Sequence, residues 1–307
     1  MYRFIVNPAA GSWHGKQEWE KIEDRIRRLP LTYEVYYTEY AGHAGELARS
    51  LGKLPDTELL GVVGGDGTLN EFAQGYDCER AVPVFYIPNG SGNDFARGLK
   101  LKVDRETAAD YLADLSLLTL SPVDIGSVTA PGRPKKRYMV SSGIGFDAAV
   151  CYDMLSSTVK KKLNDLHMGK LAYLLVGIKN MFGCPLVKGS LTADGEEQAF
   201  THLAFLSAHN LPYEGGGFFF APKAVTGDGR IDLCLVTARN HLGFITRLAG
   251  SVFKGRHIRM KGVSYLQCRE AALRLEKPLC LHADGEVLGF YSEVSFRTGD
   301  GVMRLYR

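Results

Sequence analysis

Residues 59–71 read LLGVVGGDGTLNE, and this stretch decides the fold class. Its first five residues are apolar or small, and they run directly into the glycine-rich GGDGT at 64–68. A short apolar run of this kind is typical of a buried strand, and the residues after it favour a helix. Glycines let a phosphate approach the backbone closely, and a helix N-terminus offers it free N–H groups. The stretch therefore predicts a strand–loop–helix unit that cradles a phosphate.

Strand and helix patterns alternate on both sides of this unit, which predicts βαβ units and a parallel sheet with helices on both faces. After Pro122, short strands with period-two patterning and Gly/Asp turns predominate, which is typical of a β-sandwich. We therefore predict an α/β domain over residues 1–122 and a β-sandwich domain over 123–307, with the active-site cleft between them. The expected strands of the first domain are 2–7, 33–38, 59–63 and 84–87, and its expected helices are 17–28, 44–53, 68–74 and 105–118. Helical insertions are expected in the second domain at 147–182 and 241–254.

Composition narrows the class of protein further. The 307 residues are 45% hydrophobic and 23% charged, as in a soluble globular protein. The net charge of +3 is too small to indicate nucleic-acid binding. The six cysteines show no C-x-x-C or zinc spacing, and the chain begins with a strand-like YRFIV instead of a signal sequence. These features predict a cytoplasmic protein that meets a membrane only at its surface.

The glycine-rich loop does not match the two commonest phosphate motifs. GSWHGKQ at 11–17 resembles a Walker A loop but lacks one residue between the glycines and has Gln17 where a hydroxyl should bind Mg²⁺. A dinucleotide fingerprint fails because Asn70 stands where the third glycine is needed. Asp66 beside a phosphate requires a cation between them, so the loop fits a Mg²⁺–nucleotide site. The simpler interpretation is a turn in which Asp66 caps the backbone.

Two further polar loops follow predicted strands of the same sheet. NPAAGS at 7–12 follows the first strand, and PNGSGNDF at 88–95 follows the strand at 84–87. Ligands of open parallel sheets bind beyond the carboxyl ends of the strands. We therefore expect the three loops to meet at one crevice.

In order and spacing, these motifs resemble the catalytic domain of diacylglycerol kinases, and in particular the soluble bacterial lipid kinases. The resemblance covers almost the whole chain, since it continues through DIG at 124–126, SGIGFD at 142–147, the segment 221–229 and DGE at 284–286. It implies a phosphofructokinase- or NAD-kinase-like nucleotide domain, a β-sandwich domain, and ATP with Mg²⁺ as cofactors. The residues that it implies for the ATP site are Asn7, Gly11, Ser12, Thr38, Gly64, Gly65, Asp66, Gly67, Thr68, Leu69, Asn70, Ser91 and Asn93.

The resemblance also implies catalytic and metal-binding roles. Asp66 would organise the catalytic Mg²⁺, and Glu286 would be the general base. Related bacterial proteins often carry paired aspartates before the glycine of the 221–229 segment, where a structural Mg²⁺ is held. Here Gly227 replaces the first of the pair, so Asp228 is the remaining side-chain ligand and a second Mg²⁺ stays open.

Glu286 is also a reasonable base on chemical grounds, because a lipid hydroxyl is a poor nucleophile until a carboxylate takes its proton. The same tripeptide, DGE, recurs at 194–196, and the tripeptide alone does not separate the two copies. We predict an ATP-dependent lipid kinase acting on diacylglycerol or a related lipid alcohol, with transient peripheral membrane contact and an open possibility of a homodimer. The alternatives are an NAD kinase, which has a similar GGDGT loop, and a non-catalytic lipid- or nucleotide-binding regulator.

Overall fold

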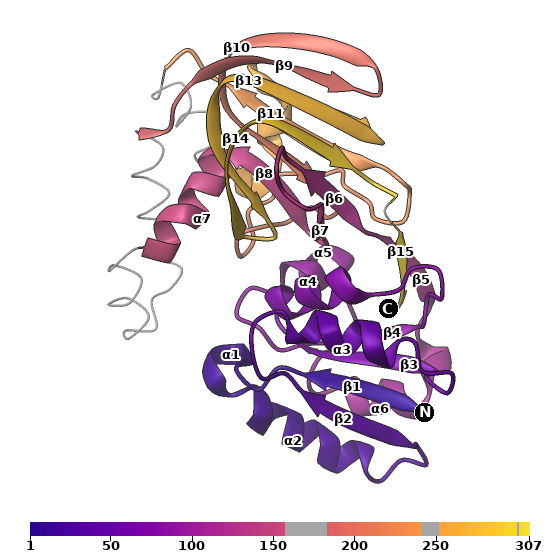
Figure 1. Ribbon diagram of the computed structural model, residues 1–307. Helices are drawn as coiled ribbons and strands as arrows, with labels where there is room; N and C mark the ends of the chain where they lie inside the picture. Colours follow the sequence, from indigo (N-terminus) through magenta and orange to yellow (C-terminus); the bar gives the residue numbers. More distant parts are fainter. Residues whose placement is uncertain (157–182, 241–251, 300) are drawn as a thin grey trace. The chain divides into compact units, whose positions relative to one another are not determined.

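The computed structural model describes residues 1–156, 183–240, 252–299 and 301–307 (Figure 1). The chain forms two compact units. The first comprises residues 1–125, 226–229 and 299–307, and the second comprises 126–225 and 230–298. The first change of unit, at 125, lies close to the predicted boundary at 122. The prediction of one continuous second domain differs from the structure, because 226–229 and the last nine residues return to the first unit.

The first unit is built on a six-stranded sheet with the order β2-β1-β3-β4-β15-β5. The four strands that the sequence predicted pair in parallel, as expected for βαβ units. β15 continues the parallel arrangement beside β4, whereas β5 is antiparallel to β15. The strands are β1 (Tyr2–Val6), β2 (Tyr33–Tyr37), β3 (Leu59–Gly64), β4 (Val84–Pro88), β5 (Leu120–Asp124) and β15 (Val302–Tyr306).

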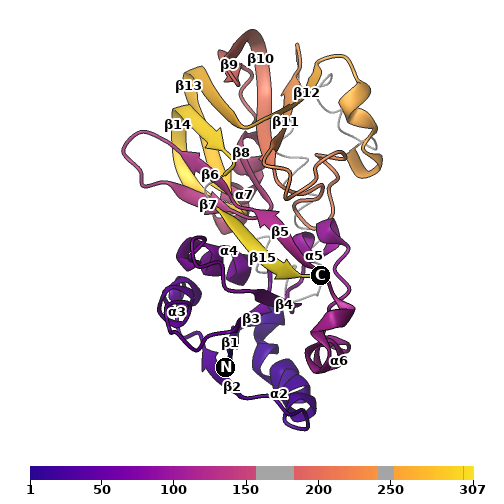
Figure 2. The same cartoon turned by 90° about the vertical axis from the view of Figure 1, so that its right-hand side faces the viewer.

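Helices cover both faces of this sheet (Figures 1 and 2). α2 and α6 lie on one face, where Trp19, Ile22 and Ile26 pack into a core with Phe4 and Phe85. α3 and α4 lie together on the other face. The helices are α1 (Ala10–Trp13), α2 (Gly15–Ile26), α3 (His43–Leu51), α4 (Asp66–Gly75), α5 (Asp94–Leu99) and α6 (Ala108–Ala113). The helix predicted at 105–118 is shorter than expected and ends in a 3₁₀ turn at Leu115–Leu117, and α5 was not predicted.

The second unit holds a nine-stranded sheet that folds back on itself to enclose a core. Two long strands, β10 (Glu196–His209) and β13 (Glu270–Ala283), pair with β9 at one end and with β8 at the other. Strands that change partners in this way turn the corners of a sandwich. The other strands are β6 (Gly126–Thr129), β7 (Lys136–Tyr138), β8 (Ser141–Gly145), β9 (Val187–Ala193), β11 (Ile231–Thr237), β12 (Val263–Cys268) and β14 (Glu286–Arg297).

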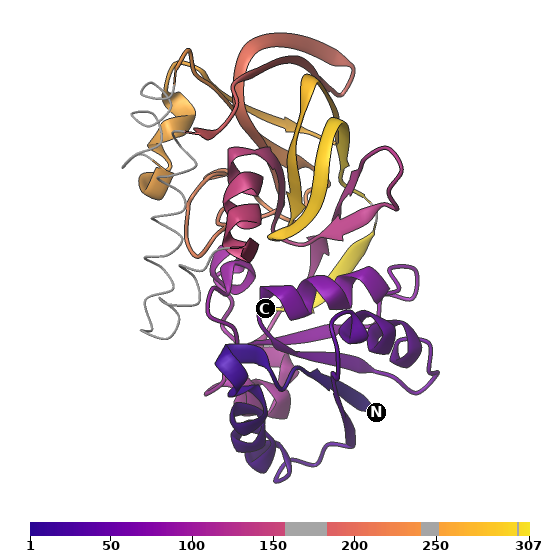
Figure 3. The same ribbon diagram turned by 60° about the vertical axis from the view of Figure 1, so that its left-hand side comes forward.

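One helix, α7 (Phe146–Ser156), packs against this sheet over β8 and β13 (Figure 3). It is the start of the insertion predicted at 147–182, and the rest of that insertion lies outside the described residues, as does most of the one predicted at 241–254. Short 3₁₀ helices follow at Val252–Lys254 and Arg256–Arg259. The β-sandwich prediction for this part of the chain is confirmed.

Candidate active site

The loops that the sequence singled out leave the sheet side by side. The N–H of Thr38 donates to the carbonyl of Val6, and the N–H of Asn7 donates to that of Val63. The N–H of Asn89 in turn donates to the carbonyl of Gly64. These bonds join the ends of β2, β1, β3 and β4 at one level of the sheet. The expectation that the polar loops meet at the carboxyl edge is therefore confirmed within the first unit.

Glycine stands at different positions of this edge of the sheet for different physical reasons. A Cβ atom on Gly64 would overlap the side chain of Thr68, whose hydroxyl accepts a 2.8 Å hydrogen bond from the Asn7 amide. A Cβ atom on Gly90 would lie 2.6 Å from the Cα of Gly65, so these two loops touch through their backbones. Gly67 is different, because a Cβ atom there would meet nothing within 4 Å. The first turn of α4 is thus exposed at Gly67, where a ligand can approach its backbone.

Asp66 joins this loop to the start of α5. One of its carboxylate oxygens accepts the N–H of Asp94 at 2.9 Å, and the other accepts that of Phe95 at 3.1 Å. Asp66 therefore caps the N-terminus of α5, which the simpler interpretation of the loop had partly anticipated. Burial raises the pKa of Asp66, while the backbone N–H groups of Asp94 and Phe95 and the charge of Arg97 act in the opposite direction. A carboxylate that burial disfavours in its charged form is stabilised by a nearby cation.

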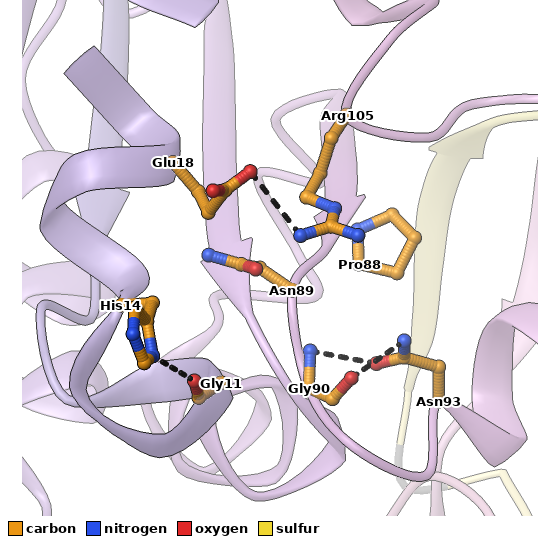
Figure 4. Close-up of a pocket in the computed structure, with 8 residues that line it drawn as sticks. All are labelled: Gly11, His14, Glu18, Pro88, Asn89, Gly90, Asn93 and Arg105. Carbon is orange, nitrogen blue, oxygen red and sulfur yellow. Dashed lines mark hydrogen bonds and ion pairs between the residues drawn. The ribbon is translucent and has the colours of Figure 1, made fainter. Parts of the chain in front are cut away.

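A pocket of about 290 Å³ opens beside these loops (Figure 4). Its lining combines two predicted site residues with side chains that the sequence did not indicate. Arg105 lies on one side and donates a 3.2 Å hydrogen bond to Glu18, and the loop below is held by two hydrogen bonds between Gly90 and Asn93. The lining residues are Gly11, His14, Glu18, Pro88, Asn89, Gly90, Asn93 and Arg105.

Glu18 and Arg105 escaped the sequence analysis because they belong to no motif, and His14 was quoted only within the rejected Walker A-like stretch at 11–17. Glu18 lies in the first turn of α2, and its pKa is lowered chiefly by its hydrogen bond to Lys21, with help from the charges of Lys21 and Arg105, against the opposing effect of burial. Arg105 lies between α5 and α6. The sequence signal for Glu18 was the position of α2 directly after the first polar loop, and Arg105 had none.

The other predicted ATP-site residues differ in exposure. Leu69 and Asn70 are buried, so their side chains point into the unit. Ser12 and Ser91 are exposed, and Thr38 is half-buried at the end of β2. Gly11 and Ser12 both adopt left-handed backbone angles, with φ of 59° and 61°. Of the predicted set, the pocket itself is lined by Gly11 and Asn93.

Asp228, the candidate ligand for a structural Mg²⁺, is exposed. The neighbouring carboxylate of Asp124 accepts the N–H groups of Gly227 at 2.6 Å and Gly229 at 3.0 Å. Both N–H groups bind the same oxygen and occupy its two lone pairs, so this oxygen holds the 226–229 segment within the first unit. Across the described residues, Asp228 does not share a group of three metal-ligating side chains. The residues present therefore do not fit a second Mg²⁺.

Glu286 lies in the second unit, directly after a tight hairpin turn between β13 and β14. Asp284 and Gly285 both have positive φ, 46° and 81°, as a type I′ turn requires. The Asp284 carboxylate accepts the N–H groups of Met139, Val140 and Ser141 at 2.7–2.9 Å. Glu286 is more than half exposed, and its carboxylate lies 2.6 Å from the Nζ of Lys136.

The second copy of the tripeptide folds in the same way. Asp194 and Gly195 have φ of 45° and 90°, and Asp194 accepts the N–H groups of Arg269 and Glu270. Both aspartates thus have the same structural task, and the turn itself does not distinguish a catalytic glutamate from an ordinary one.

Comparisons with known proteins agree with this arrangement. Residues 1–128 match the family model described as the diacylglycerol kinase catalytic domain. Residues 145–304 match the YegS C-terminal NAD kinase beta sandwich-like domain. The chain belongs to the diacylglycerol kinase family. The lipid-kinase family that the motifs predicted is thereby confirmed.

Individual relatives of this diacylglycerol kinase family member cover nearly its full length. The diacylglycerol kinase of Bacillus subtilis is 28% identical over 291 residues, which are 94% of this chain and 90% of that protein. The diacylglycerol kinase of Staphylococcus carnosus is 29% identical over 292 residues, covering 94% and 89%. Among solved structures, a diacylglycerol kinase from Bacillus anthracis superposes with a TM-score of 0.74 at 22% identity, covering 100% of this chain and 96% of that one.

A more distant structure shares the fold. An NAD kinase from Archaeoglobus fulgidus, solved in complex with ATP, has a TM-score of 0.54 at 15% identity, covering 100% of this chain and 94% of that one. It confirms the prediction of a fold related to NAD kinases. In the described part of this family member, no helix has the length and apolar character needed to cross a membrane.

Proposed function

We propose that the protein is an ATP- and Mg²⁺-dependent lipid kinase that transfers the γ-phosphate of ATP to the hydroxyl of diacylglycerol or a related lipid alcohol. The observation that carries the proposal is the edge of the first sheet, where Gly67 leaves the first turn of α4 open beside the partly buried carboxylate of Asp66. An exposed helix N-terminus next to a carboxylate suits a phosphate with its cation.

For the nucleotide, we assign binding to the first unit. The backbone around Gly64–Thr68 would take phosphate oxygens, and the pocket beside Gly11, Asn93 and Arg105 would take the rest of ATP. Asn7 and Thr68 support this loop through their mutual hydrogen bond. Each carboxylate oxygen of Asp66 accepts one backbone N–H, and its remaining lone pair would bind Mg²⁺, whose role is to neutralise phosphate charge.

For the acceptor, we assign Glu286 as the general base. Its carboxylate is exposed, while Asp284 is fully engaged with the backbone of 139–141, so only Glu286 of the pair is available to take a proton. A positioned carboxylate typically contributes a factor of about 10² to 10⁴ to such a proton transfer. Lys136 orients the carboxylate through their ion pair.

Diacylglycerol resides in membranes, so the proposal includes transient contact with the inner face of the cytoplasmic membrane. The basic run at 135–137, on and beside β7, supports attraction to anionic headgroups, at about 1 kcal/mol for each charge near the surface.

The acceptor is tested by incubating the purified protein with γ-labelled ATP and Mg²⁺. Dioleoylglycerol, a sphingoid base, a long-chain alcohol and NAD are offered separately, the lipids in detergent micelles. We expect label in dioleoylglycerol or another lipid alcohol. Label only in NAD would replace the proposal by an NAD kinase, as the shared fold allows, and ATP binding without any label would indicate a regulator.

A further inference from the structure

The two DGE turns sit in a longer repeat that differs at one position. Residues 191–196 read LTADGE, and residues 281–286 read LHADGE. Both segments end a strand and form the same type I′ turn, with Ala193 opposite Glu196 and Ala283 opposite Glu286. The turn that carries the proposed base therefore has a histidine, His282, where its copy has Thr192.

His282 is buried and binds the turn directly. Its Nδ1 accepts the N–H of Gly285 at 3.1 Å, and its Nε2 lies 3.3 Å from Oδ2 of Asp147, the first acidic residue of α7. Asp147 is itself fixed, because its Oδ1 accepts the N–H of Ala148 at 2.8 Å. A continuous chain of contacts thus runs from the start of α7 through the imidazole to the middle of the turn.

The sheet has space for the side chains of Asp147 and His282. Gly143 lies opposite His282 in the ladder between β8 and β13, and a Cβ atom there would overlap the Asp147 carboxylate. The pairing of β13 with β14 shifts register between Leu281 and His282. Irregularities of this kind re-aim a side chain, and they are common beside active sites.

The hydrogen bonds of its two ring nitrogens exclude His282 as a metal ligand. Asp147, Glu214 and His282 bring their ligand atoms within 4.8 Å of one another, all buried. A neutral imidazole has one lone pair, and the Gly285 N–H already uses the one on Nδ1. Nε2 must then carry the hydrogen, which it donates to Asp147, so it has no lone pair for a metal.

We propose that His282 and Asp147 are positioning residues that hold the Asp284–Glu286 turn, and with it the Glu286 carboxylate, in a single conformation. This inference rests on the proposed function for its catalytic consequence, although the hydrogen bonds themselves do not. Asp147 selects the tautomer of His282, and that tautomer leaves Nδ1 free to accept the N–H of Gly285.

Protonation of His282 opposes this arrangement, because an imidazolium places a hydrogen on Nδ1 facing the Gly285 N–H. Burial and the nearby His209 disfavour the imidazolium, whereas Asp147, Glu214 and Asp284 favour it. The balance raises the pKa of His282, since its hydrogen bond to Asp147 and the surrounding carboxylates outweigh burial. At a pH below the pKa of His282, the turn loses the hydrogen bond from the Gly285 N–H to the imidazole.

Two matched variants distinguish the role of Nδ1 from that of Nε2 in His282. His282→Asn places an amide oxygen near the position of Nδ1 and keeps an acceptor for Gly285, whereas His282→Gln extends toward Asp147 and loses that acceptor. With dioleoylglycerol micelles and saturating ATP, we expect kcat to fall about 10- to 100-fold in His282→Gln and to stay within about threefold in His282→Asn. The KM for ATP should be unchanged in both. The loss of kcat on the acid side should be smaller in His282→Asn than in the wild type.

A second measurement does not depend on activity. In ¹⁵N-histidine-labelled wild type at pH 8, assigned by difference from His282→Asn, the ring shifts should show a hydrogen on Nε2 and none on Nδ1 of His282. A hydrogen on Nδ1 would overturn the inference, as would equal losses of kcat in the two variants. If the wild type phosphorylates no lipid, the proposed function fails, and the ring shifts alone decide whether His282 holds the turn.

Discussion

Three aspartates in this protein bind backbone N–H groups of neighbouring segments. Asp66 holds the start of α5, Asp124 holds the 226–229 segment, and Asp284 holds residues 139–141 at the start of β8. A short carboxylate side chain reaches nearby N–H groups without much loss of side-chain entropy, whereas a glutamate carries its carboxylate one carbon further from the backbone. The division of labour within Asp284-Gly285-Glu286 follows from this difference in reach.

The role of Glu286 is tested by a pair of equal substitutions in the two copies of the tripeptide. We expect Glu286→Gln to lower kcat about 10²- to 10⁴-fold because the amide takes no proton, while ATP binding is retained. Glu196→Gln, in the same kind of turn, should leave kcat within about twofold. Initial rates and calorimetric titration with ATP measure both quantities. Equal rates in the two variants would remove Glu286 from catalysis.

Arg105 offers a test of the pocket beside the glycine loops. Its guanidinium is half-exposed and paired with Glu18, so it can reach an anion without leaving a buried charge behind. We expect Arg105→Leu to raise the KM for ATP about tenfold with little change in kcat, since this contact would serve ground-state and transition state alike. Arg27→Leu, which removes an exposed ion-paired arginine from the end of α2, is the control. A change in kcat alone would contradict this role.

At the scale of strands and helices, local sequence patterns predicted the elements whose formation depends on residues close to one another in sequence. β1 to β4 and the helices between them follow from apolar runs bounded by polar loops, and the meeting of those loops follows from parallel pairing. β15 was not placed in the first sheet, because nothing in VMRLY distinguishes a strand of one sheet from a strand of the other. Glu18 and Arg105 were missed because their contact joins residues 87 positions apart.

The buried half of β10 makes stability depend on pH in a predictable direction. His209 is fully buried, and burial, with smaller effects of nearby histidines, lowers its pKa to about 3. The unfolded chain therefore takes up this proton first as the pH falls below about 6.5, and the stability that neutral His209 provides is lost between there and about pH 3.

Between pH 7 and pH 5.5, this single group removes roughly 1.3 kcal/mol from the free energy of unfolding. We expect His209→Gln to be less stable at pH 7 but to lose about that much less on acidification, as measured by urea unfolding. His202→Gln, on the same strand at a half-buried position, is the control. An identical loss in wild type and His209→Gln would show that His209 titrates normally.

At the scale of the whole molecule, the last strand is a structural requirement of the first unit. β15 lies between β4 and β5, and Met303 and Leu305 on it are fully buried. Two side chains of this kind provide roughly 3–6 kcal/mol, a large part of the stability of an ordinary domain. The first unit therefore depends on β15, which is separated from the rest of its sheet in sequence by the strands of the second unit.

Neighbouring positions on β15 test this dependence. We expect Met303→Ala to destabilise the first unit by about 2–4 kcal/mol because it leaves a cavity in a closed core. Val302→Ala, at an exposed position one residue earlier, should cost less than about 1 kcal/mol. The Tm is measured by thermal unfolding with and without ATP, and the transition that ATP shifts is assigned to the first unit. Equal effects would mean that β15 adds little to the sheet.

The order in which the chain visits its two units has a consequence for synthesis on the ribosome. The second unit can complete all its strands once residue 298 has emerged, whereas the first sheet has a gap between β4 and β5 until β15 has emerged as well. Domains generally fold as units during synthesis, with the N-terminal one first. Here that order is reversed, so a chain truncated after residue 298 would carry all the strands of the second unit and an incomplete sheet in the first.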